Sequence, residues 1–281
     1  MIPLSRERSA KAVSPKFRAP KKSAKDKELL LAQRDFLSGV AQEVPFQSTF
    51  WKTAKKQLKK ESGGKCAYCE ANTEIVAHGD VEHYRPKSVY WWLAYTYDNY
   101  LYACQICNQV YKSDNFPIAG TTLFQGPAIS ATTTDTEIDL LAGRISPDPL
   151  AVDADYTLEA YLAEHRKEMA FLLNPYFDDP SEYLGYEADD LTKEVKVVPT
   201  KPEYAEHVKA AEDYYGLNRI ELRNYRYKTY KTYQLFKRSL LKLSDETLKA
   251  EVSQQLEEMQ AKDYLFAGMN RYFDVHPVVS S

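Results

Sequence analysis

Apolar residues recur with a helical period along most of the chain. Between residues 23 and 37 the leucines Leu29 and Leu30 and then Phe36 fall on one face, with Ser23 as a candidate N-cap. A second helix is predicted over residues 50–62, because Gly63 follows it directly. Further helical patterns cover residues 158–173, 204–243 and 245–264. Only short stretches, such as residues 73–77 and 81–84, have strand character, with a turn between them. The pattern therefore predicts a mostly helical α+β protein.

The chain divides into three parts by composition. Residues 1–22 are rich in Pro, Ser and Lys, so we expect an extended basic arm. Residues 23–117 would hold N-terminal helices and a small compact module. Residues 118–281 would hold an acidic connector followed by a C-terminal helical region. The connector is expected to be loop-like to about residue 150 and rich in turns and acidic residues between about 175 and 200.

Hydropathy and charge limit the classes of function. No run of about 18 apolar residues occurs, which excludes a transmembrane helix. The first residues, MIPLSRERSA, lack an apolar stretch, so we expect no secretory signal and a cytoplasmic protein that does not meet a membrane. The net charge is −3, yet residues 1–65 carry 16 Lys and Arg against 6 Asp and Glu, while residues 118–200 carry 5 against 16. The basic part would suit phosphates and the acidic part a protein partner, although both can equally be solvated faces.

The four cysteines of the chain all lie in one short region. Cys66 and Cys69 form one C-x-x-C pair, and Cys104 and Cys107 form the other. Two such pairs complete a tetrahedral zinc shell, whereas a redox pair would explain only one of them. Disulfides are not expected in a cytoplasmic protein. We therefore predict a structural zinc site without an open coordination position.

Polar residues suited to phosphodiester hydrolysis surround these cysteines. His83 has the pKa range of a general base, and Glu82 and Asn108 offer the oxygen ligands that Mg²⁺ or Mn²⁺ prefers. Asn108 and Lys112 are four residues apart and share a helix face. Arg85, Lys87 and Lys112 are candidate phosphate contacts or, alternatively, solvated cations, and Asp80 is a rival to Glu82 as the acidic ligand.

The segments CAYC, EHYRPKS and DNYLYACQICNQVYK together resemble the HNH (ββα-metal) endonuclease motif with an embedded four-cysteine zinc site. The resemblance implies two strands and a helix set into helices from both ends of the chain. It also implies that Glu82 and Asn108 hold the catalytic ion, that His83 is the general base and that Asn99 orients it. Many members have Asp and His where this chain has Glu82 and Asn108.

Two further segments, LLNPYFDDPSEYL and YYGLNRIELRNYR, are similar to the HNH nucleases of Septu-type anti-phage systems and of some retrons. This resemblance implies DNA as the substrate, an ATPase partner of the ABC/SMC-like type and, for retrons, an RNA/DNA complex. Two alternatives stay open. The zinc site can shape a binding module without catalysis, and the same chemistry can cleave RNA, including transfer RNA. His78, His165, His207 and His276 have no motif around them and are expected to be non-catalytic.

Overall fold

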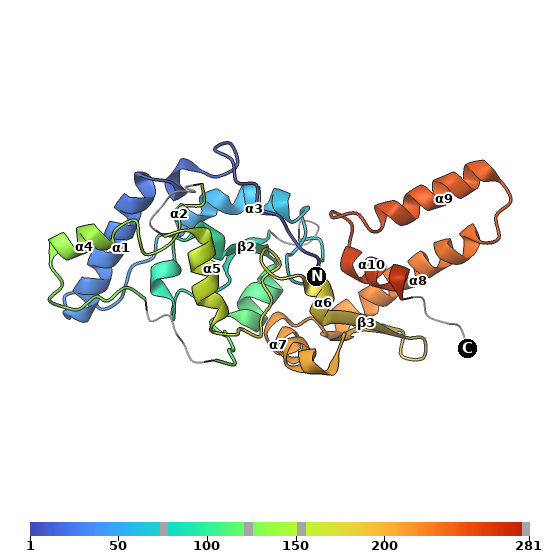
Figure 1. The fold of residues 1–281 in the computed structure, drawn as a ribbon. Coiled ribbons are helices and arrows are strands. Elements are labelled where there is room, and N and C mark those ends of the chain that lie inside the picture. Colours follow the sequence, from blue (N-terminus) through green and yellow to red (C-terminus); the bar gives the residue numbers. More distant parts are fainter. Residues whose placement is uncertain (74–77, 121–125, 151–155, 277–281) are drawn as a thin grey trace.

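The computed structural model describes residues 1–73, 78–120, 126–150 and 156–276. The molecule is elongated, with α1 and α4 at one end and a hairpin of α8 and α9 extending from the other (Figure 1). The helices are α1 (Lys21–Leu37), α2 (Ser48–Trp51), α3 (Lys55–Glu61), α4 (Asp135–Leu141), α5 (Leu158–Arg166), α6 (Pro180–Tyr183), α7 (Ala205–Tyr215), α8 (Ile220–Leu240), α9 (Glu246–Glu258) and α10 (Ala267–Val275). Short 3₁₀ turns η1 (Pro15–Phe17), η2 (Lys52–Ala54), η3 (Trp91–Leu93), η4 (Tyr97–Asn99) and η6 (Pro202–Tyr204) connect them, and η5 (Ile106–Lys112) is a π-helix.

Two small antiparallel sheets complete the fold. Strand β1 (Asp80–His83) pairs with β2 (Tyr100–Ala103), and β3 (Leu184–Asp189) pairs with β4 (Glu194–Pro199). The predicted α+β, mostly helical class is therefore confirmed. The expected hairpin partner of β1, residues 73–77, lies largely outside the described residues, and β1 instead pairs with a strand about twenty residues later.

Strand β2 separates the two main hydrophobic cores. Successive side chains of a strand point to opposite faces. Leu101 and Ala103 accordingly join the core that contains the cysteines, α7 and the β3–β4 sheet. Tyr100 and Tyr102 join the other core, beside α1 and α3. Since all four side chains are buried, the backbone of β2 and of its partner β1 is fixed from both sides.

The first 22 residues pack into the body instead of forming the expected free arm. Ile2, Val13 and Phe17 are buried. Arg6 lies in an ion pair with Glu61, and Arg8 with Asp98. Because these apolar residues are interspersed with cations, the sequence pattern does not indicate that they are buried.

Some basic residues of the first third form ion pairs with acidic residues of the middle of the chain. Helix α1 packs against α4, which places Arg34 2.6 Å from Asp135 and Lys27 2.5 Å from Asp139. Basic residues of the first third are thus neutralised by acidic residues of the middle. The segregation is in this part an internal contact, and fewer cations remain for an external phosphate.

Several elements differ from the predicted pattern. Helix α4 lies in the stretch expected to be a loop, and a capping box between Thr134 and Glu137 begins it. The β3–β4 hairpin occupies the stretch expected to consist of turns. The long helix expected over residues 204–243 is two helices, because Gly216 adopts a left-handed conformation (φ 62°) that ends α7. No described helix is long and apolar enough to span a membrane.

Candidate functional site

The four cysteines converge on one point. Their sulfur atoms all lie within 4.8 Å of one another, and Cys69 Sγ is 4.0 Å from Cys104 Sγ. Cys66 and Cys69 sit on a tight turn closed by a hydrogen bond from the Glu70 N–H to the Cys66 carbonyl. Cys104 and Cys107 lie at the start of η5, where the Cys107 N–H points to Cys104 Sγ. None of the four forms a disulfide.

This arrangement fits a zinc ion. Four thiolates at about 2.3 Å from one ion would be about 3.8 Å from each other, close to the separations in the structure. The guanidinium of Arg219 approaches Cys107 Sγ to 3.5 Å, and a cation there offsets the excess negative charge of four thiolates around one zinc. The four cysteines can therefore hold one metal ion such as zinc.

The end of β1 and the middle of η5 meet in a cavity of about 310 Å³. Glu82 and His83, the last two residues of β1, line it together with Asn108. Asn108 follows Cys107 directly, and its own N–H donates to the Cys104 carbonyl. The turn that carries the second cysteine pair therefore fixes the position of Asn108. Three of the four residues implied by the HNH resemblance share this cavity.

The ring of His83 is held on several sides. Nε2 lies 3.0 Å from the carbonyl oxygen of Ala94, which can only accept, so Nε2 carries the proton and Nδ1 is an acceptor. The rings of Trp51 and Tyr100 contact the imidazole edge-on. Burial lowers the pKa of His83 to about 3, and Lys87 and Lys112 act in the same direction. The imidazole is therefore neutral near pH 7, the state in which it can take a proton.

Glu82 is paired with a lysine from the facing helix. Lys112 Nζ lies 2.6 Å from Glu82 Oε1 and donates to the His83 carbonyl oxygen at 2.9 Å. Both side chains are buried. Burial raises the pKa of the Glu82 carboxyl, and the charge of Lys112 opposes this rise. Lys112 thus ties η5 to the end of β1.

Asn99 acts on the backbone next to His83. Its Oδ1 accepts from the Arg85 N–H at 2.8 Å, and its Nδ2 donates to the Arg85 carbonyl at 3.0 Å. The fully buried side chain does not line the cavity, and the contact that orients the His83 ring comes from Ala94 instead. Asn99 therefore fixes the chain just after His83 and acts on the His83 ring only through the backbone.

Two of the three candidate phosphate contacts are placed differently from the expectation. Arg85 is buried, with its Nε 2.9 Å from Glu168 Oε2, and it faces another part of the molecule. Lys112 is fully buried against Glu82. Both are held in internal ion pairs, because each lies on the inner side of its segment. Lys87 alone of the three lines the cavity.

The cavity also contains residues that the sequence analysis did not predict as part of the site. Trp51 precedes His83 by 32 positions, and nothing in its own segment indicates this contact. Asp114 lines the cavity and is exposed, two residues after Lys112. Asp80 is not part of the lining, and its Oδ2 accepts from Gln109 Nε2 at 2.8 Å.

The cavity offers a smaller donor set than the cysteines. Among the described residues, only the four cysteines form a group of three or more His, Cys, Asp or Glu side chains close enough for one ion. Glu82 and Asn108 provide one carboxylate and one amide, and Glu82 shares its charge with Lys112. Such hard oxygen donors fit Mg²⁺ or Mn²⁺, which keep several waters when bound. A cavity that is lined by polar groups and open to solvent suits this mode of binding.

Comparison with known proteins gives one informative match. No protein-family model matches the chain, and no solved structure matches it. The chain is 28% identical over 211 residues to the Septu protein PtuB of Bacillus mycoides (strain KBAB4), which covers 70% of this chain and 57% of the relative. The chain thus spans little more than half the length of this relative. The resemblance to Septu proteins that the sequence segments indicate is confirmed by this match: the chain is similar to a Septu PtuB protein.

Proposed function

We propose that this protein is a metal-dependent endonuclease that hydrolyses phosphodiester bonds in DNA and serves anti-phage defence. The observation that carries the proposal is the convergence of Glu82, His83 and Asn108 on one polar cavity beside the cysteine cluster. The similarity to a Septu protein supports the defence role, and the HNH resemblance supports the chemistry. We further propose an ATPase partner of the ABC/SMC-like type, as that resemblance implies.

The residues would divide the reaction between them. Nδ1 of His83 is the acceptor on the ring, so it would take a proton from the attacking water. Glu82 and Asn108 would hold a divalent ion, which supplies positive charge to the scissile phosphate and the leaving oxygen. Asn99 and Ala94 would keep the base in place. Lys87 would contact a phosphate, since it lines the same cavity.

The approach of DNA is supported by a basic surface next to the cavity. Lys52 is exposed next to Trp51, and Trp51 lines the cavity together with Lys87. Trp51, directly before Lys52, already contacts His83. Cations at this position would hold the phosphate backbone of a duplex near the cavity.

The test is cleavage of supercoiled plasmid by the purified protein with Mg²⁺, with Mn²⁺ and without an added divalent ion. Wild type is compared with His83→Ala and with His165→Ala, which removes another buried imidazole hydrogen-bonded to a backbone carbonyl. We expect metal-dependent nicking that only His83→Ala abolishes. Equal cleavage by wild type and His83→Ala would overturn the mechanism.

If the wild type is silent alone, the assay is repeated with the proposed ATPase partner. Cleavage that then appears and requires His83 supports the proposal. Persistent silence with DNA, together with cleavage of RNA by the same preparation, would assign an RNA nuclease. Silence with both would assign a binding module.

A further inference from the structure

A second pocket, of about 420 Å³, lies on the other side of the segment that follows His83. Tyr84 and Arg85 line it, whereas Glu82 and His83 line the candidate catalytic cavity. The two sets of lining residues have no member in common. Helix α5, the segment after it and α7 close the pocket from the other directions. It is therefore a separate site, which the proposed nuclease chemistry does not use.

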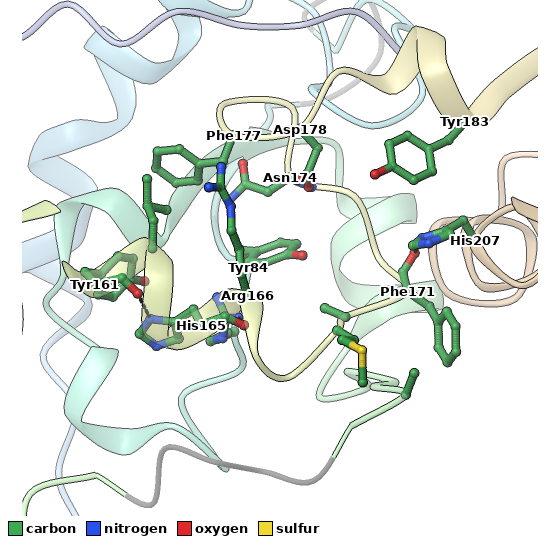
Figure 2. A pocket seen from close by; sticks show the side chains of 15 residues that line it. Tyr84, Tyr161, His165, Arg166, Phe171, Asn174, Phe177, Asp178, Tyr183 and His207 are labelled. Atoms are coloured by element: carbon green, nitrogen blue, oxygen red, sulfur yellow. Dashed lines mark hydrogen bonds between the residues drawn. The ribbon is translucent and has the colours of Figure 1, made fainter. Parts of the chain in front are cut away.

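Five aromatic rings of Tyr and Phe residues line it: Tyr84, Tyr161, Phe171, Phe177 and Tyr183. Figure 2 shows Tyr84 and Arg166 between Tyr161 on one side and His207 on the other. Tyr84 and Tyr161 are buried, whereas the other three rings are partly exposed. Rings of this kind offer flat surfaces on which a planar, π-rich group can stack.

Most polar groups of the pocket are already engaged. The Tyr84 hydroxyl donates to the Leu172 carbonyl, and Arg85 is paired with Glu168. His207 Nδ1 lies 2.9 Å from the Phe171 carbonyl. Arg166 differs from these, because its exposed side chain forms no hydrogen bond or close ion pair with any described residue, and the carboxylate of Asp178 only attracts it from a distance. Its guanidinium is thus available for an anion, and guanidinium binds phosphate through two parallel N–H donors.

One carboxylate lies in the same pocket. Asp178 Oδ2 accepts from the Asn174 N–H at 2.7 Å, and its other oxygen remains an acceptor. A carboxylate oxygen suits an exocyclic amine of adenine, cytosine or guanine. Flat rings and an acceptor together match the base of a nucleotide, and the guanidinium matches its phosphate. The volume is at the lower end of small-molecule sites and leaves room for one such unit.

We propose that this pocket binds a single nucleotide, with an amine-bearing base among the aromatic rings and the phosphate on Arg166. The nucleotide can be free in solution or can belong to a single strand, and the two sources share this chemistry. The proposal goes beyond the nuclease activity, since it concerns binding at a site that lacks His83.

Calorimetric titration of the full chain without added divalent ions tests the proposal. The ligands are 5′-AMP, 5′-UMP, adenosine and inorganic phosphate, and a single-stranded DNA of five adenylates provides the second source. We expect saturable binding of AMP with a Kd of about 1 mM or tighter, and binding of UMP, adenosine and phosphate about tenfold weaker. A strand that binds more tightly than AMP identifies the strand as the source, and the reverse identifies the free nucleotide.

Substitutions then locate the site. Arg166→Gln should weaken AMP binding about tenfold, whereas Lys167→Gln, at the next cation in the chain, should leave it unchanged. Phe177→Leu should also weaken AMP binding about tenfold. A thermal melt shows whether Arg166→Gln is folded, and Phe177→Leu replaces it as the test if it is not. AMP binding no tighter than phosphate binding, or binding that is unchanged in folded Arg166→Gln, would overturn the proposal.

Discussion

The two candidate sites of this protein lie side by side and are built in opposite ways. Cys107 and Asn108 are consecutive in η5, yet Cys107 joins a cluster of four thiols, three of them buried, and Asn108 lines an open polar cavity. The thiols complete a coordination shell by themselves. The cavity supplies one carboxylate, one amide and one imidazole, so water and substrate would have to complete it.

The difference shows how one short helix can serve structure and chemistry together. The i→i+5 hydrogen bond from the Ser113 N–H to the Asn108 carbonyl belongs to a π-helix, a form that is often found at functional sites. Lys112 at its far end holds Glu82, and the cysteines hold its start. A metal ion on the cysteines would thereby fix the distance between the walls of the cavity.

Removal of one thiol should have the largest effect. Cys69→Ser should lower the zinc content from about one ion per chain to near zero, because three ligands bind zinc far more weakly than four. The start of η5 would then lose its anchor, and we expect the melting temperature to fall by more than about 10 °C. Metal analysis and calorimetry measure both quantities. A zinc content that stays near one would show that the four cysteines are not the site.

Loss of the Asn99 side chain should damage the cavity but spare the cysteines. Asn99→Ala leaves the buried N–H and carbonyl of Arg85 without partners, so the free energy of unfolding should fall by about 2–4 kcal/mol. Cleavage should fall at least about tenfold, and zinc content should not change. Urea unfolding provides the first value. Asn115→Ala, which removes a hydrogen bond from an exposed residue to the Lys112 carbonyl, is the control and should change stability by less than about 1 kcal/mol.

A moderate effect is expected beside the thiols. Arg219→Gln removes the cation near Cys107 Sγ, and zinc affinity should fall about tenfold in competition with a chelator. Arg223→Gln, about one turn further along α8, breaks an ion pair with Glu194 of β4 and should leave zinc affinity unchanged. Equal affinities in the two variants would mean that Arg219 only packs there.

The smallest effect concerns single lysines of the basic surface. Lys52→Ala should weaken duplex DNA binding about two- to threefold and reduce the salt dependence by about one counterion. Lys242→Ala, an exposed lysine that follows α8, should do neither. Fluorescence anisotropy at several salt concentrations measures both. Salt-independent binding by the wild type would argue against a phosphate-facing surface.

Local spacing made the cysteine site predictable, because two C-x-x-C turns dictate their own geometry. The convergence of Glu82, His83 and Asn108 followed from the resemblance to HNH enzymes and not from composition. The burial of Arg85 and Lys112 was not predictable, since their partners Glu168 and Glu82 depend on how distant segments pack.

Other elements depended on information beyond a single segment. The capping box at Thr134 is a local signal for the start of α4. The loop-like composition of the surrounding residues nevertheless led to the prediction of a loop. The β3–β4 hairpin was concealed by its acidic residues, although residues 194–198 alternate in burial. Burial of the first residues arises from contacts with parts of the chain far away in sequence, such as Arg8 with Asp98.

The most direct measurement compares His83→Ala and Cys69→Ser in one experiment that records zinc content, melting temperature and plasmid cleavage, with the proposed ATPase partner where it is needed. If one site is structural and the other catalytic, His83→Ala keeps about one zinc ion per chain and a melting temperature near that of the wild type but loses cleavage. Cys69→Ser loses all three. Cleavage by His83→Ala at the wild-type rate, with the protein folded and zinc bound, would contradict the assignment of the cavity.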